Sequence, residues 1–279
     1  MIRATVVDRP AIEAFLTDHI ATSMFPLSNL RNHGMAGGHP RAETFWVRWD
    51  AGQITDVVTV TDEGFAFPQC PTMPWGDVRV ALAGQALRGI MGEAGQVSGM
   101  RAAMNWTETA QVDDVDPLFQ LGLAELQLPD CAGYVLSPLG NADRDLAQDW
   151  RATYLKETGL FPGEAPALTA KKQIADYIRA DSHRVLYRAG QPVGMTGFNA
   201  QLPQSVMIGG VFTPPEFRGQ GVARRAVGLH LKEARENGVT GAMLFAANDG
   251  AARVYEAIGF KKIGAFAMVI YKDPQVIHV

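Results

Sequence analysis

The sequence predicts an α/β protein of the α+β type, with a mixed central sheet flanked by helices and two domains. Its 279 residues suit two domains of ordinary size. Apolar residues make up 47% of the chain and charged residues 19%, a balance typical of a protein with a substantial core. Strand-like and helical patterns also alternate along the chain, which indicates strands and helices in one layered arrangement.

The first domain is predicted at residues 1–130, where the mixed pattern is less regular. Helices are expected at 11–21 and 77–93, and strands at 43–49, 54–61 and 64–67. The expected helix at 77–93 has Val80, Leu82, Leu87, Ile90 and Met91 as its apolar positions. This order of strands and helices is comparable to that of the second half.

The second domain is predicted at residues 131–279, after a helical pattern ends at Pro129 and a strand-like run begins. The apolar positions of a helix expected at 222–236 fall on one face, as in a helix packed on a sheet. The elements expected in chain order are a strand at 134–139, helices at 143–156 and from a cap at Thr169 to about 180, strands at 183–188, 192–200 and 205–212, the helix at 222–236, a strand at 242–247, a helix at 251–258 and a last pair of strands ending near Tyr271.

Composition excludes several classes of function. A net charge of −4 and a pI near 5.9 argue against nucleic acid as the main partner, because such binders need a basic field. The start of the chain lacks a signal peptide's apolar segment and no stretch is long enough to span a bilayer, so we expect no membrane association and a cytoplasmic protein. Cys70 and Cys131 are far apart and are expected to be reduced thiols. His33 and His39 flank a glycine cluster without a third ligand, so no metal is expected.

The segment FRGQGVAR, residues 217–224, places two glycines between a strand and a helix. Unpaired N–H groups and the helix dipole make such a helix N-terminus a potential anion site. A P-loop requires Gly-Lys-Ser/Thr entering the helix, and a dinucleotide fingerprint requires a third glycine where this chain has Arg224. A third pattern, Arg/Gln-x-x-Gly-x-Gly/Ala, is matched in full by Arg218, Gly221 and Ala223. A turn that merely caps the helix is the structural alternative.

A second segment, NDGAARVYEAIGF at 248–260, accompanies the glycine loop. Ala251 and Tyr255 lie four residues apart on one helix face, with alanine leaving room for a ligand beside the ring. The structural alternative makes Asn248 or Asp249 an N-cap, Tyr255 a core aromatic residue and Gly259 a C-cap. With both segments, the chain resembles the GNAT superfamily of acyl-CoA-dependent N-acyltransferases over about residues 134–272.

This resemblance implies direct acyl transfer from acetyl-CoA, the co-substrate, to a primary amine of a small-molecule or amino-acid-like acceptor. It implies that Tyr255 protonates the leaving thiolate as the general acid. It also implies a CoA-binding set: Val211, Phe212 and Thr213 for the pantetheine arm, Arg218, Gly219, Gln220, Gly221, Val222 and Ala223 for the pyrophosphate, Arg224 near the phosphates, and Asn248 and Ala251 at the thiol end.

No general base is assigned, because the strands expected at 192–200 and 205–212 contain no carboxylate or histidine. Glu164, Glu216 and a chain of water molecules are the candidates. The resemblance extends to two-domain proteins of this type, so residues 1–130 are expected to be a degenerate copy or an unrelated domain for acceptor specificity. A monomer or homodimer is expected. The alternative function is a non-catalytic sensor or regulator that binds acyl-CoA.

Overall fold

The computed structural model describes residues 1–159 and 165–278, and it divides into two compact units. The first unit comprises Met1–Asp116 together with Gly264–Val279, and the second comprises Pro117–Ile263. The boundary predicted at 130/131 differs from this division in two places. The second unit begins within a strand that precedes residue 130, and the end of the chain belongs to the first unit.

The first unit contains a sheet with the strand order β1-β2-β3-β4-β5-β12. Strands β2, β3 and β4 form an antiparallel meander, and β5 then runs parallel to β4. The elements are β1 (Ile2–Arg3), α1 (Arg9–Asp18), α2 (Ile20–His33), β2 (Glu43–Asp50), β3 (Gln53–Thr61), β4 (Phe65–Gln69), α3 (Trp75–Ala81), β5 (Ala86–Glu93), α4 (Ala94–Met104) and the last part of β12 (Lys261–Val276).

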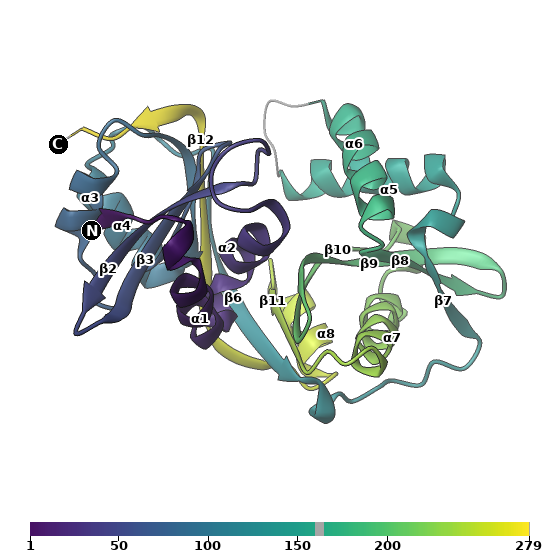
Figure 1. Ribbon diagram of the computed structural model, residues 1–279. Helices are drawn as coiled ribbons and strands as arrows, with labels where there is room; N and C mark the ends of the chain where they lie inside the picture. The colour runs from purple at the N-terminus through teal and green to yellow at the C-terminus, as the bar shows by residue number, and fades with distance from the viewer. Residues whose placement is uncertain (160–164, 279) are drawn as a thin grey trace. The chain divides into compact units, whose positions relative to one another are not determined.

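The second unit contains a sheet with the strand order β6-β11-β10-β9-β8-β7. In Figure 1, α5 and α6 lie on one side of β8, β9 and β10, and α7 lies on the other. The elements are the end of β6 (Val112–Gly122), β7 (Tyr134–Pro138), α5 (Arg144–Thr158), α6 (Pro166–Arg179), β8 (His183–Arg188), β9 (Gln191–Leu202), β10 (Ser205–Phe212), α7 (Val222–Glu236), β11 (Gly241–Phe245) and α8 (Asp249–Glu256).

Both units share one succession of elements. Each has a pair of helices, three antiparallel strands, a helix, a strand parallel to the third, and a further helix. In each unit the strand that pairs with this parallel strand comes from the other half of the sequence: β12 pairs with β5, and β6 pairs with β11. This exchange of closing strands explains why the compact units do not coincide with the two sequence halves.

Three predicted elements are wrong in detail. The helix expected at 77–93 is α3 followed by strand β5, because Gly84 turns the chain in the left-handed conformation (φ +80°) and Gly89 allows close packing on Val269. The pair of strands expected at the end of the chain is the single strand β12. Helix α6 starts at Pro166 after Ala165, not at a Thr169 cap, since proline is well suited to the first helical position.

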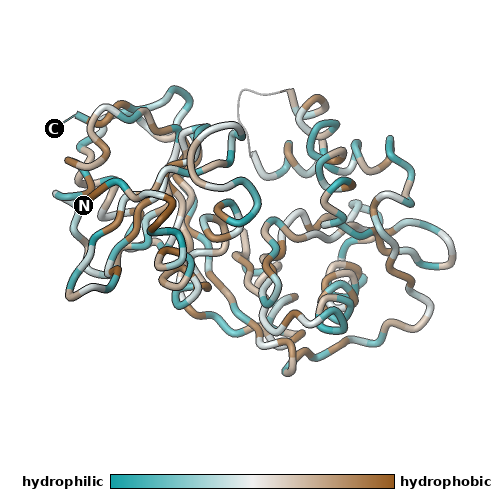
Figure 2. Tube along the Cα trace, viewed as in Figure 1, coloured by the Kyte–Doolittle hydropathy of each residue, from teal (hydrophilic) through white to brown (hydrophobic). Residues whose placement is uncertain are grey.

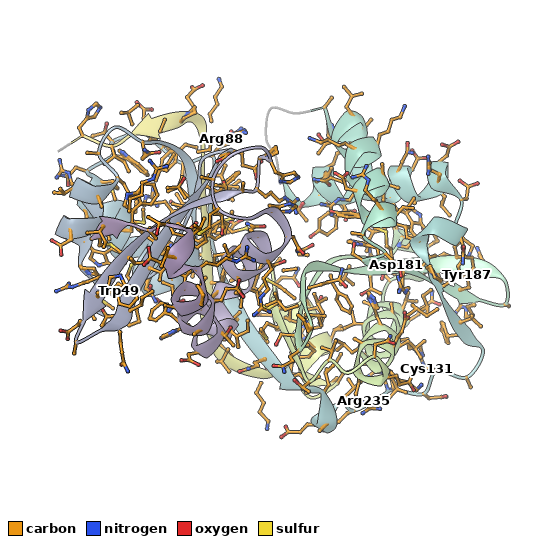
Figure 3. The ribbon with its side chains drawn as sticks, viewed as in Figure 1. Trp49, Arg88, Cys131, Asp181, Tyr187 and Arg235 are labelled. Carbon is orange, nitrogen blue, oxygen red and sulfur yellow. The ribbon has the colours of Figure 1, made fainter. Side chains whose placement is uncertain are left out.

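Each unit has its own hydrophobic core. In the first unit, Trp46, Ile90 and Met100 pack with Val269 of β12. Trp49 does not join this core and is 37% exposed near the turn of the β2–β3 hairpin (Figure 3). In the second unit, the buried face of α7 packs on the sheet, and Figure 2 shows both hydrophobic and hydrophilic residues along this helix.

Both cysteines, Cys70 and Cys131, are free thiols. Cys70 is buried in the first unit, where burial raises the pKa of its thiol. In residues 1–159 and 165–278, no helix has the length and apolar character that crossing a membrane requires.

A buried histidine makes the stability of the second unit sensitive to acid. His230 of α7 is buried and stacks on Phe198 at 3.8 Å, and burial lowers the pKa of His230 to about 3. In the unfolded chain this group titrates near 6.5, so below that pH only the unfolded state takes up the proton. Between pH 6.5 and 5, His230 should therefore remove about 2 kcal/mol from the free energy of unfolding.

Urea unfolding at several pH values would measure this loss. His230→Gln should weaken less than the wild type between pH 6.5 and 5, by about the same 2 kcal/mol. Identical pH slopes for the two proteins would contradict the assignment. His183 is also buried, with its pKa well below the ordinary value, and its contribution remains in both proteins.

Candidate active site

The candidate site lies where two parallel strands of the second unit separate. Strands β10 and β11 are paired at Ser205–Gly241, Val206–Ala242 and Met207–Met243, and their pairing ends there. Beyond Met207, β10 continues to Phe212 with β9 on its other side only. The backbone N–H and C=O groups on the open edge are therefore available to an extended ligand that adds like a strand.

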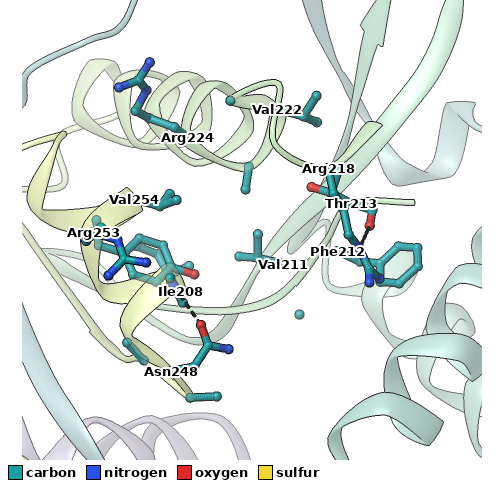
Figure 4. A pocket seen from close by; sticks show the side chains of 18 of the residues that line it. Ile208, Val211, Phe212, Thr213, Arg218, Val222, Arg224, Asn248, Arg253 and Val254 are labelled. Atoms are coloured by element: carbon teal, nitrogen blue, oxygen red, sulfur yellow. Dashed lines mark hydrogen bonds between the residues drawn. The ribbon is translucent and has the colours of Figure 1, made fainter. Parts of the chain in front are cut away.

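A cavity of about 1050 Å³ occupies this opening. Its walls come from the end of β10, the loop before α7, the start of α7, the residues after β11, and α8. Figure 4 shows Val211 of β10, Val222 of α7 and Val254 of α8 around the same space. A cavity of this size is large enough for a cofactor-sized molecule.

The glycine loop adopts a conformation that only glycine takes without strain. Gly219 and Gly221 have φ values of +74° and +71°, and Gly221 is the N-cap of α7. Arg225 stabilises the loop, since its Nη1 donates to the carbonyl oxygens of Gln220 (3.0 Å) and Gly221 (3.3 Å). The N-terminus of α7 thus faces the cavity with the geometry of an anion site.

Charge in the lining is strongly asymmetric. Arg218, Arg224, Arg225 and Arg253 line the cavity, and Glu157 is the one carboxylate among its described lining residues. Glu157 is already paired with Arg218, whose Nη2 donates to it at 2.8 and 2.9 Å. The Nε of Arg224 is buried and has no partner among the described residues. A polyanionic ligand would meet a net positive surface.

Tyr255 stands in the wall of the cavity with its side chain almost fully buried, at 8% exposure. Its ring packs edge-on against Phe260 at a centroid distance of 6.0 Å. Burial, and to a smaller degree the nearby Tyr154, raises the pKa of the Tyr255 phenol. The phenol therefore keeps its proton at neutral pH and can donate it to a group in the cavity.

Asn248 is the N-cap of α8, with its side-chain oxygen accepting from the N–H of Ala251 at 2.9 Å. The structural alternative for Asn248 is thus realised. It does not exclude a second role, because this hydrogen bond uses the oxygen and leaves the amide NH₂ free to donate to a ligand. Asn248 and Ala251 both line the cavity (Figure 4 labels Asn248).

Every residue that the sequence assigns to the site lines this one cavity: Val211, Phe212, Thr213, Arg218, Gly219, Gln220, Gly221, Val222, Ala223, Arg224, Asn248, Ala251 and Tyr255. Of the two side chains considered as the general base, Glu216 is exposed and is not part of the lining. Glu164 lies outside the described residues.

Sequence reasoning missed several lining residues, among them Tyr154, Glu157, Asn199 and Arg253. Tyr154 and Glu157 come from α5, and Asn199 comes from β9. These side chains reach the cavity only through packing of separate elements, so no local pattern marks them. Arg225, which supports the glycine loop, has no signal that distinguishes it from Arg224.

His33 and His39 lie in the first unit and stack on each other, with ring centroids 3.8 Å apart. Within the described ranges, no group of three His, Cys, Asp or Glu side chains could hold a metal ion. The stacked pair therefore has no third ligand in that part of the chain.

Comparisons with known proteins find a match to a family model within the second unit. Residues 146–260 match the model of the acetyltransferase (GNAT) family. The chain is also 42% identical over 55 residues to the acetyltransferase Atu2258 of Agrobacterium fabrum. That match spans 20% of this chain and 40% of the relative, so the chain covers less than half of the relative's length.

Solved structures are similar over nearly the whole chain. A GCN5-related N-acetyltransferase from Kribbella flavida is 20% identical with a TM-score of 0.56, covering 91% of this chain and 95% of its own. A tandem GNAT protein from the clavulanic acid biosynthesis pathway is 14% identical with a TM-score of 0.56, covering 96% of each chain. At these identities the likeness concerns the fold, and it includes both units.

Proposed function

We propose that the protein transfers an acetyl group from acetyl-CoA to a primary amine, because residues 146–260 match the model of the acetyltransferase (GNAT) family. The acceptor is a small molecule or an amino-acid-like compound. The observation that carries the proposal is the cavity between β10 and β11, whose walls contain the complete glycine loop and Tyr255 together.

The chain's own residues fit the parts of acetyl-CoA. Backbone groups at Val211–Thr213 face the opening beyond the last β10–β11 pair and suit the amides of the pantetheine arm. The N-terminus of α7 at Gly221 suits the pyrophosphate, and Arg224 adds positive charge beside it. Asn248, through its free amide, suits the thiol end.

In the transfer, acetyl-CoA supplies an activated thioester. The amine nitrogen forms a bond to the carbonyl carbon as the carbon–sulfur bond breaks, and the amine loses one proton to water. The Tyr255 phenol donates its proton to the departing sulfur. The phenolate that remains regains a proton from water, and because burial raises its pKa the phenol is protonated again before the next turnover.

A non-catalytic acyl-CoA sensor is the second candidate. It is favoured by the lining itself, because the described lining residues include no histidine and only one carboxylate, which is held by Arg218. A sensor would not require a phenol at the thiol end, and Tyr255 therefore favours the enzyme.

Acetyl-CoA turnover with a panel of amines separates the two functions. We expect CoA release that depends on the amine and on Tyr255, together with an acetylated product by mass spectrometry. Tight acetyl-CoA binding without turnover of any amine would favour the sensor.

We further propose that the first unit is a degenerate copy that contributes to acceptor specificity and binds no CoA. Its loop before α3 occupies the place that corresponds to the glycine loop of the second unit. Thr72 of this loop donates its N–H (2.9 Å) and its hydroxyl (2.6 Å) to the buried carboxylate of Asp56 in β3. A buried carboxylate at this position uses the loop's donors and repels a pyrophosphate.

Isothermal titration calorimetry should therefore find one acetyl-CoA site per chain. Asp56→Asn should leave that stoichiometry at one, because the first unit also lacks the glycines. Two equivalent sites in the wild type would contradict the assignment of the first unit.

A further inference from the structure

Arg151 is a buried arginine without an acidic partner. It lies in the middle of α5 at 5% exposure, and its Nε donates to Oε1 of Gln173 at 2.7 Å. The guanidinium stands over the rings of Tyr154 (4.6 Å) and Tyr177 (5.5 Å). Among the residues that the structure describes, no carboxylate forms an ion pair with it and its two terminal nitrogens have no hydrogen-bond acceptor.

The other buried arginine of this unit shows what is missing. Arg184, at 7% exposure, forms ion pairs with Asp181 (2.8 Å) and Glu233 (2.7 Å). A buried charge is costly unless it is paired and hydrogen-bonded, and Arg184 meets that requirement within the chain. Arg151 meets it only in part. The two terminal nitrogens of Arg151 are thus held in place by two tyrosine rings, and they remain available to bind a carboxylate.

Nη1 of Arg151 lies beside Gly210 in the wall of the cavity, and Arg151 itself is not among the described lining residues. A Cβ built on Gly210 would lie 3.8 Å from Nη1 of Arg151, and Gly210 itself lines the cavity. Gly210 sits in an irregular part of β10 with φ +63°. It directly precedes Val211–Thr213, whereas the glycine loop follows them, so Arg151 approaches this segment on the side away from the glycine loop.

A second buried polar atom converges on the same point. His183 is fully buried, and its Nε2 has no partner and would lie 2.9 Å from that Cβ of Gly210. The ring is fixed by stacking on Tyr177 at 3.7 Å and by a 2.8 Å contact between Nδ1 and the Ser182 hydroxyl. Two rigid polar groups from α5 and β8 therefore face one position beside the cavity.

We propose that Arg151 binds a carboxylate of the acceptor, so that the substrate is an amine that also carries a carboxylate, such as an amino acid. The proposal rests on the transferase function above and specifies its substrate class. The guanidinium would hold the carboxylate in a bidentate ion pair and so orient the amine toward the thioester. Neutral amines would leave the buried charge unpaired, and a site of this kind discriminates strongly against them.

The test compares α- and ω-amino acids, each beside its own carboxamide, as acceptors with acetyl-CoA. For the best of these pairs, the wild type should have a kcat/KM at least about 100-fold higher with the amino acid than with its carboxamide. Arg151→Gln should lose at least about 100-fold for the amino acid, mainly through KM, and little for the carboxamide. Its acetyl-CoA dissociation constant should match the wild type. The control Arg144→Gln changes an exposed arginine at the start of the same helix and should alter neither acceptor.

Several results would overturn the proposal. A wild type that acetylates amino acids and their carboxamides equally well excludes a carboxylate site, whatever the variants do. If Arg151→Gln lowers kcat/KM equally for the amino acid and its carboxamide, Arg151 is a structural residue. If the glutamine variant does not fold, Arg151→Lys, which retains the charge, is compared with the wild type in its place. If succinyl-CoA replaces acetyl-CoA as a donor only in proteins that retain Arg151, then Arg151 binds a carboxylate of the acyl donor and not of the acceptor. If acetyl-CoA binds but no amine of either kind is acetylated, the transferase function itself fails.

Discussion

Replacing Tyr255 by phenylalanine should lower kcat by about 10²- to 10⁴-fold and leave the acetyl-CoA dissociation constant nearly unchanged. This range corresponds to roughly 3–5 kcal/mol of barrier at about 1.36 kcal/mol per decade. The substitution keeps the buried ring and its contact with Phe260, so the free energy of unfolding should change little. Only the phenolic proton is removed. The expected loss therefore belongs to the transition state in which sulfur departs.

The measurement is kcat with a saturating acceptor, beside the acetyl-CoA affinity, for the wild type and the variant. The loss should shrink with an acyl donor whose thiol leaves more easily, because that thiolate needs less help from a proton. Tyr187→Phe is the matched control, since Tyr187 lies in β8 of the same unit and is not part of the cavity lining. Tyr255 would be a packing residue if the variant kept more than about half of kcat while chemistry limits the rate.

Replacing Gly221 by valine should weaken acetyl-CoA binding by at least about 100-fold. A Cβ at Gly221 already lies 2.8 Å from Nη1 of Arg225, and the branched side chain would also fill space at the N-terminus of α7. The loop's N–H groups would no longer reach the pyrophosphate. Losing two charge-assisted hydrogen bonds, at about 1.5–3 kcal/mol each, gives a loss of that order or more.

This variant also introduces backbone strain, because Gly221 has φ +71° and valine tolerates that conformation poorly. Gly238→Val is the control for strain alone. Gly238 follows α7 with φ +91°, has open space around its Cβ and is not part of the cavity lining. Both variants should lose stability, and calorimetry should show weaker acetyl-CoA binding only for Gly221→Val. Equal affinity of a folded Gly221→Val protein and the wild type would exclude the pyrophosphate assignment.

The candidate site could be predicted from the sequence because its main parts are local. The conformation of Gly219 and Gly221 and the helix that follows depend on a few consecutive residues, and Ala251 and Tyr255 share a face through helical spacing alone. The helix at 222–236 was likewise predictable, since its apolar positions repeat with the helical period. These features depend on the local backbone, so they are the same in any tertiary structure in which these two helices form.

The division of the chain could not be predicted in the same way. A strand is defined by its partner, and β5 and β6 acquire theirs, β12 and β11, from distant residues. The apolar spacing of residues 80–91 fits a helix. The chain instead turns at Gly84 and then forms strand β5, in which Gly89 allows the close approach of Val269. Pro117 and three aspartates also give β6 weak strand character of its own.

By itself, then, the sequence determined the local parts of the candidate site: the glycine loop, the helix that follows it, and the ring of Tyr255 on the next helix. Only the tertiary structure decided which strand closes each sheet, where β10 and β11 separate, and which side chains meet at the end of β10. Arg151 and His183 lie far apart in the sequence on different elements, and neither belongs to a pattern. Their convergence on Gly210 results from the packing of α5 and β8 against β10, because burial and charge pairing depend on neighbours that no local spacing specifies.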